Sequence, residues 1–147
     1  MTRMTADRES GLVDTNILIL RHRIREEDLP QRIAISAVSL AELTAGVHLV
    51  DADTADAAAE RARRLAILQR AESEFDPLPF DAGAARIYGQ LVAAAVAIGR
   101  TPRRRVADFM IAATAASNGL ALYTTNPDDY RGLAPVVAVV PVPRPPD

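Results

Sequence analysis

Short apolar segments alternate along this chain with longer segments of helical spacing, and this alternation restricts the fold more than any other feature. The short segments, each a candidate strand, span residues 11–13, 33–35, 120–124 and 136–140. The longer segments, each a candidate helix, span residues 17–24, 39–50, 52–71, 81–98 and 106–118. Strands that alternate with helices typically form a mostly parallel sheet covered by helices. The sequence therefore predicts an α/β layer fold.

Capping and turn residues divide the chain at the expected boundaries. Asp81 can cap the helix that follows it, and Gly99 and Gly119 can end two helices. Residues 75–80 contain two prolines and are predicted to form an edge strand or a connector. The 147 residues suffice for one domain with a hydrophobic core. We expect this domain to span residues 11–140, between an N-terminal extension (1–10) and a proline-rich tail (141–147).

Two residue types are missing from the sequence, and each absence excludes a class of chemistry. All 17 basic residues are Arg, so the chain has neither the lysine of a P-loop nor a lysine for Schiff-base chemistry. Phosphoryl-transfer domains of the receiver and haloacid types also depend on a lysine, and the haloacid type requires Asp-x-Asp, where this chain has Asp14-Thr15-Asn16. The chain has no Cys, which excludes disulfides and thiolate zinc sites.

The charge balance and hydropathy give weaker expectations about location and partners. The net charge of −2 counts modestly against nucleic acid as a partner, although a local basic patch is compatible with it. No apolar run approaches the roughly 18 residues that cross a bilayer, so we expect no membrane segment. The polar first ten residues lack the apolar core of a signal peptide, and we expect a cytoplasmic protein.

Four acidic residues lie within or at the ends of apolar segments, where an isolated carboxylate is costly. They are Asp14, Glu42, Asp108 and Asp129. A carboxylate that leaves water must be paired, protonated or bound to a metal. Asp14 follows the first predicted strand and Asp129 lies just after the third, at the sheet edge where ligands of such folds bind. A shared divalent cation is the simplest common partner, because hard cations prefer oxygen ligands.

Each acid also has a structural alternative. Asp14 could be a helix N-cap, and Asn16 could orient it or bind a metal-held water. Ser39 and Glu42 fit a capping box, which on sequence alone is the better interpretation of Glu42. The dipole of its helix could simply stabilise Asp108 as a first-turn acid, but its apolar neighbours favour a ligand role.

The fourth acid has two candidates in one turn. Asp128 and Asp129 follow Asn126-Pro127, which is common turn chemistry, and the spacing does not separate them.

Four segments, taken in order and spacing, resemble a PIN-domain nuclease and most of all the VapC-type toxins of bacterial toxin–antitoxin pairs. The segments are Leu-Val-Asp-Thr-Asn-Ile-Leu (12–18), Ser-Ala-Val-Ser-Leu-Ala-Glu-Leu-Thr-Ala-Gly-Val (36–47), Asp-Phe-Met-Ile-Ala-Ala-Thr-Ala (108–115) and Leu-Tyr-Thr-Thr-Asn-Pro-Asp-Asp-Tyr (122–130). The resemblance runs from about residue 11 to residue 140. It implies a PIN-like three-layer α/β/α domain with a mostly parallel central sheet.

The resemblance also implies an activity and a site. It implies a metal-dependent endoribonuclease that inhibits translation and growth, with a carboxylate-bound Mg²⁺ or Mn²⁺. Asp14, Glu42 and Asp108 match the family's acidic positions, Thr125 and Asn126 match its polar turn, and Asp129 is a better match than Asp128 for the fourth acid. Our hypothesis is that Asp14 and Asp108 hold the principal metal, that Glu42 binds it through water or helps to activate the nucleophile, and that Asp129 completes the second side.

Partners follow from the same resemblance. It implies a VapB-type antitoxin, whose arginine-bearing tail reaches into the acidic pocket, an RNA substrate such as tRNA or rRNA, and a homodimer. The alternative is a non-catalytic α/β binding module whose acidic pocket docks an arginine-bearing partner.

A basic run, Arg100, Arg103, Arg104 and Arg105, comes directly before Asp108. Arginine suits phosphate through bidentate hydrogen bonds, so the run could grip an RNA backbone beside the site. A solvated loop explains the run equally well. The two histidines, His22 and His48, are predicted to be surface or packing residues.

Overall fold

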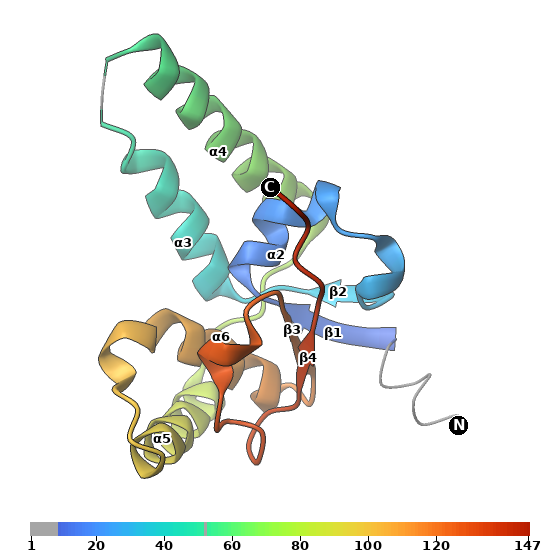
Figure 1. The fold of residues 1–147 in the computed structure, drawn as a ribbon, viewed down its shortest axis with the longest axis vertical. Coiled ribbons are helices and arrows are strands. Elements are labelled where there is room, and N and C mark those ends of the chain that lie inside the picture. The colour runs from blue at the N-terminus through green and yellow to red at the C-terminus, as the bar shows by residue number, and fades with distance from the viewer. Residues whose placement is uncertain (1–8, 52) are drawn as a thin grey trace.

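The computed structural model describes residues 9–51 and 53–147, which form a four-stranded, all-parallel sheet covered by helices (Figure 1). The strand order is β2-β1-β3-β4, with β1 (Ser10–Val13), β2 (Arg32–Ala34), β3 (Ala121–Thr124) and β4 (Val139–Pro141). In the register, Leu12 lies opposite Ala34 on one side and Leu122 on the other. Residues 1–8, which make up most of the predicted N-terminal extension, and Ala52 lie outside the described residues.

Helices lie on both faces of this sheet. They are α2 (Thr15–Leu20), α3 (Ala37–His48), α4 (Ala55–Glu74), α5 (Ala82–Ala97) and α6 (Val106–Ser117), with short 3-10 turns η1 (Arg21–Arg23), η2 (Glu26–Asp28), η3 (Pro102–Arg105) and η4 (Pro127–Tyr130). Of the helices in the described residues, none is long and apolar enough to cross a membrane.

Alternate residues of the central strands divide the core into two clusters. Leu12 and Leu122 pack with the α5–α6 layer, which contributes Leu91 and Phe109 among others. Their neighbours Val13 and Tyr123 pack with α2, α3 and α4 on the other side. Because successive strand residues point to opposite faces, each central strand is buried on both sides, as parallel sheets are. The predicted three-layer α/β/α fold is confirmed.

The long helices α3 and α4 form an antiparallel hairpin that extends away from the sheet (Figure 1). Only the inner ends of this hairpin enter the core, through Leu43 of α3 and Leu68 and Ala71 of α4. The hairpin therefore forms one wall beside the sheet edge where the strands end.

Several predicted helix boundaries are confirmed. Asp81 caps α5, with Oδ1 accepting from the Ala84 amide at 2.9 Å. Gly99 and Gly119 follow α5 and α6 with positive φ angles of 77° and 66°, a backbone conformation that glycine adopts without a steric penalty. Residues 75–80 form a connector with one isolated parallel bridge, between Ser36 and Leu78.

The predicted capping box at Ser39 and Glu42 is wrong. α3 begins two residues earlier, with Ser36 as its N-cap: the Ser36 hydroxyl accepts from the Val38 amide at 3.0 Å. Ser39 lies inside the helix and is fully buried, so its hydroxyl is not at a helix end. Glu42 is thereby freed from a capping role.

Other segments also differ in extent from their prediction; the helix expected at 52–71, for example, forms α4 at Ala55–Glu74. The helix expected at 17–24 ends as α2 at Leu20 and continues as the 3-10 turn η1. The strand expected at 136–140 begins only at Val139, because the amides of Val136 and Val137 donate to the Leu133 carbonyl in a turn. Sheet pairing then continues beyond residue 140, since the Val142 amide donates to the Thr124 carbonyl at 2.7 Å.

Candidate active site

Asp14 follows β1 directly and is both a helix cap and a member of the acidic cluster. Its Oδ1 accepts from the Ile17 amide at 3.2 Å, which caps α2. Its Oδ2 faces another partner, the hydroxyl of Tyr130. The residue is only 4% exposed. Asp14 can therefore be both a helix N-cap and a member of the acidic cluster, because its two carboxylate oxygens face different partners.

Asp108 reaches the same place from α6. This helix leads back into β3, so its first turn lies at the sheet edge where the parallel strands end. The Tyr130 hydroxyl, on η4, lies 3.4 Å from Asp14 Oδ2 and 3.5 Å from Asp108 Oδ1. Two carboxylates from distant parts of the chain thus face one hydroxyl group.

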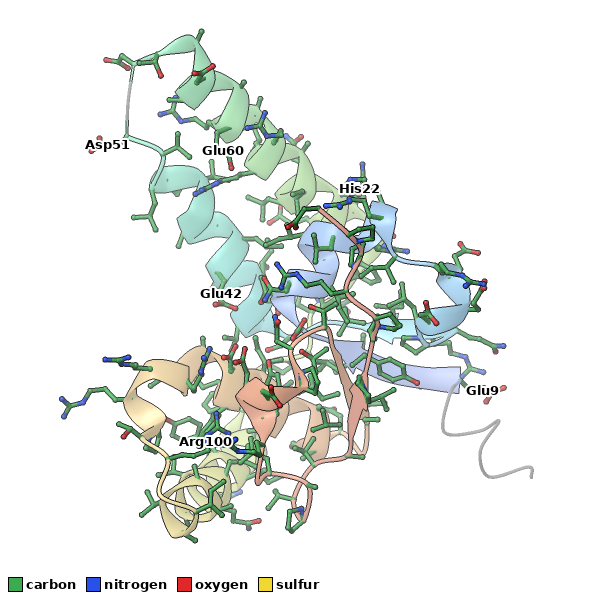
Figure 2. All side chains as sticks on the ribbon, viewed as in Figure 1. Glu9, His22, Glu42, Asp51, Glu60 and Arg100 are labelled. Carbon is green, nitrogen blue, oxygen red and sulfur yellow. The ribbon has the colours of Figure 1, made fainter. Side chains whose placement is uncertain are left out.

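Glu42 faces the start of α2. The Thr15 hydroxyl donates to Glu42 Oε1 at 2.5 Å and lies 2.9 Å from the Ser39 hydroxyl. Thr15 is the neighbour of Asp14 in the chain, so this hydrogen bond ties α3 to the acidic edge. Figure 2 shows Glu42 on the part of α3 next to the sheet, with Glu60 farther out along the hairpin.

Of the two adjacent acids on η4, Asp129 is the one directed towards the others. Its Oδ1 accepts from Arg105 Nη2 at 3.0 Å, and Arg105 Nη1 lies 3.4 Å from Asp108 Oδ2. Asp128 is exposed and does not line the cleft that the other acids share.

The four acids Asp14, Glu42, Asp108 and Asp129 line one cleft of about 650 Å³ between the sheet edge and the α3–α4 hairpin. Asn16 lines it as well, as does the exposed His22, which was predicted to be a surface or packing residue. Arg63 and Arg64 of α4 form part of the outer wall. A second cavity, of about 710 Å³, lies near β2 and lacks the clustered aspartates.

Burial and the neighbouring negative charges make Asp14 and Asp108 reluctant to ionise. Burial raises the pKa of Asp14 above its ordinary value, and the Asp108 charge adds to this, although hydrogen bonds from Thr124, Ile17 and Tyr130 oppose it. Burial also raises the pKa of Asp108, as do the charges of Asp129 and Glu42, while the Arg105 guanidinium lowers it. Such perturbed groups in a cleft are typical of functional sites, and a bound cation would relieve the repulsion.

The donor set fits a divalent metal by its chemistry, since it consists of carboxylates and hydroxyls. In the described residues, no three acids are close enough together to hold an ion in this side-chain arrangement. Asp14 and Asp108 both face the Tyr130 hydroxyl, at 3.4 and 3.5 Å. Binding of one ion by three of these acids would therefore involve side-chain movement within the cleft.

The predicted supporting residues lie in different surroundings. Asn16 is exposed in the cleft. Thr125 is buried, and its hydroxyl has no hydrogen-bond partner among residues 9–51 and 53–147. Asn126 accepts from Arg144 Nη1 at 3.3 Å, so it contacts the C-terminal tail.

The structure separates the basic run into three environments. Arg100 donates to the backbone carbonyls of Arg131 and Asp129, at 2.6 and 2.9 Å, and so supports η4. Arg105 pairs with the acids, as described above. Arg103 and Arg104 are exposed. The run is therefore not a single solvated loop, and only Arg103 and Arg104 are fully open to a nucleic-acid partner.

Sequence reasoning missed three hydroxyl groups that hold the acids. Thr15 and Tyr130 contact them as described, and buried Thr124 bonds to Asp14 and accepts from the Asn126 amide at 2.9 Å. The only sequence signal was proximity, because each of these three residues is next to a predicted site residue. Nothing in the sequence indicates that their hydroxyl groups face the acids.

These features define a class of protein. A family model described as the PIN domain matches residues 11–134, and the chain belongs to the PIN-domain family. Among its relatives, the chain is 37% identical over 133 residues to Ribonuclease VapC5 of Mycobacterium tuberculosis (strain ATCC 25618 / H37Rv), covering 88% of this chain and 92% of that protein. The predicted resemblance to PIN-domain proteins of the VapC type is confirmed.

Solved structures agree with this assignment. VapBC-5 from Mycobacterium tuberculosis, a toxin–antitoxin system, matches with a TM-score of 0.74 and 35% identity, over 91% of this chain and 98% of that one. DNA-bound VapBC from Salmonella typhimurium matches with a TM-score of 0.62 and 26% identity, over 88% and 96%. FitAcB from Neisseria gonorrhoeae matches with a TM-score of 0.62 and 28% identity, over 87% and 94%.

Proposed function

We propose that this protein is a metal-dependent endoribonuclease that acts as the toxin of a toxin–antitoxin pair and inhibits translation and growth. The observation that carries the proposal is the convergence of Asp14, Glu42, Asp108 and Asp129 on one cleft of a PIN-domain chain. The similarity to Ribonuclease VapC5 supports RNA as the substrate class.

The chemistry requires a nucleophilic water and relief of negative charge at phosphorus. A bound Mg²⁺ or Mn²⁺ supplies both, by lowering the pKa of its water and polarising a phosphoryl oxygen. Asp14 and Asp108 would hold this ion, and Asp129 would complete the site from η4. Glu42, held by Thr15, would orient the attacking water. Tyr130 would keep the two aspartates aligned through its hydroxyl.

The proposed partners are a VapB-type antitoxin, a cellular RNA such as tRNA or rRNA, and a second copy of the chain. The VapBC structures that match this fold support the antitoxin. Exposed apolar side chains at the end of α5 and the start of α6 support a homodimer: Val96, Ile98 and Val106 are 59%, 49% and 42% exposed. We place the activity in the cytoplasm, where these RNAs are found.

Purified protein with end-labelled RNA tests the activity directly. Wild type should cleave the RNA at discrete positions when Mg²⁺ or Mn²⁺ is present, and EDTA should stop cleavage. Asp14→Asn should keep the fold, because Asn is also a good N-cap, and should lose cleavage. A folded wild type that binds Mn²⁺ and an antitoxin but cuts no RNA would favour the non-catalytic binding module instead.

A further inference from the structure

Arg105 places a positive charge among the acids from within the chain. It is the last residue of η3, directly before α6, and its guanidinium spans two carboxylates. Nη2 lies 3.0 Å from Asp129 Oδ1, and Nη1 lies 3.4 Å from Asp108 Oδ2. Among the described residues, no other cation forms an ion pair with any of the four acids.

The fold makes this contact from two directions. Arg105 and Asp108 are three residues apart at the start of a helix, a spacing that brings their side chains together. Asp129 comes from η4, which Arg100 holds through the carbonyls of Asp129 and Arg131. Both ends of the basic run therefore hold η4. Arg100 binds backbone carbonyls of this segment, and Arg105 binds the Asp129 side chain.

The charge of Arg105 acts where a metal's charge would act. Its guanidinium contacts Asp129 and Asp108 through oxygens that a metal ion would need. A guanidinium and a divalent cation that share these oxygens repel each other, so each weakens the binding of the other.

We propose that Arg105 is an internal counter-ion that competes with the divalent metal for Asp108 and Asp129. This inference rests on the proposed metal site. The Arg105 side chain is 42% exposed, so its ion pairs are screened and weak enough for a metal to displace them. Metal binding would move the guanidinium out of the cleft and let the carboxylates converge.

Mn²⁺ binding, measured by calorimetry or electron paramagnetic resonance, tests this without reference to activity. The experiment uses the full chain, free of antitoxin and RNA, as wild type, Arg105→Gln and Arg104→Gln. Arg104→Gln is the matched control. It removes the same charge from an exposed neighbouring residue that forms no ion pair with the four acids. Arg105→Gln should bind Mn²⁺ roughly three- to tenfold more tightly than wild type, the effect of removing weak ion pairs. Arg104→Gln should bind with nearly the wild-type affinity.

The outcomes separate this inference from the proposed function. If wild type binds Mn²⁺ and Arg105→Gln binds no more tightly than Arg104→Gln, Arg105 positions the acids and the competition is refuted. If no form of the protein binds Mn²⁺, the metal site itself fails, and the competition fails with it. Should Arg105→Gln fold poorly, Arg105→Lys replaces it; the lysine cannot span both carboxylates, so a smaller tightening is expected and unchanged affinity contradicts the inference.

Discussion

The hydroxyl of Tyr130 lies 3.4 Å from Oδ2 of Asp14, a residue 116 positions earlier in the chain. Tyr130 is buried, and burial together with the nearby carboxylates raises its pKa, so the phenol stays protonated and remains a donor. Its ring packs in the core while its hydroxyl faces the acids. The core and the candidate active site are thus joined through one side chain.

Tyr130→Phe should therefore weaken the site while keeping the fold. Loss of one hydrogen bond, worth about 0.5–1.5 kcal/mol, should raise the pKa of Asp14 further and weaken Mn²⁺ binding at pH 7. Calorimetric titration measures this, with Tyr88→Phe outside the cleft as the control. Equal Mn²⁺ affinity in both variants would show that the Tyr130 hydroxyl does not align the acids.

Asp14→Asn should change how stability depends on pH in the metal-free protein. The pKa of Asp14 is raised on folding from its ordinary value of 3.8, so near and above that pH the folded state binds more protons than the unfolded chain. The free energy of unfolding therefore falls as pH rises from the ordinary pKa of Asp14 through its raised pKa in the folded state. The variant lacks this loss and should therefore melt at a higher temperature than wild type at pH 7, by about 2–4 °C for each 1 kcal/mol gained in the free energy of unfolding.

Scanning calorimetry in EDTA between pH 4 and 8 checks this expectation. The advantage of Asp14→Asn should shrink towards pH 4, and added Mn²⁺ should stabilise wild type alone. An advantage independent of pH would mean that the carboxylate charge is not its cause.

Thr15→Val should slow cleavage without unfolding the protein, because it removes the donor that holds Glu42 while keeping the side-chain shape. A positioning effect of about 1 kcal/mol corresponds to a roughly three- to tenfold lower rate. Single-turnover cleavage of labelled RNA measures it. Thr44→Val is the control, since the Thr44 hydroxyl donates to the Leu40 carbonyl within α3. If both variants cleave at equal rates, Glu42 needs no such support.

The two exposed arginines of the basic run should contact the RNA backbone. In an Asp14→Asn background, which we expect to bind RNA without cutting it, the double change Arg103→Gln with Arg104→Gln should reduce the dependence of log affinity on log salt. The expected reduction is about 1.4, or about 0.7 per lost phosphate contact. Filter binding across a salt series measures this slope. The exposed pair Arg32 and Arg86 provides the control, and an equal reduction there would indicate a general charge effect.

The sheet and the sheet-edge acids could be predicted because their signals are local. Asp14 stands directly after an apolar strand, and Asp108 lies among apolar neighbours. The start of α3 could not be settled in the same way, because Ser36 and Ser39 are equally good caps. Only the end of β2 and the buried position of Ser39 decide between them.

The basic run shows a second limit of local signals. Arg100, Arg103, Arg104 and Arg105 are alike in sequence, yet one binds backbone carbonyls, one pairs with acids and two are exposed. The direction of each arginine side chain on η3 and the position of η4 beside it decide these differences, and both depend on tertiary structure. The same holds for Tyr130, whose role depends on a contact with the opposite end of the chain.

The central claim is that the acidic cleft cuts RNA, and mapping of RNA 5′ ends after induced expression in a bacterial host tests it most directly. Wild type should arrest growth and produce new 5′ ends at discrete sites, whereas Asp14→Asn and Asp108→Asn should do neither at equal protein levels. New ends at the same sites and in the same abundance with the Asn variants would contradict the claim.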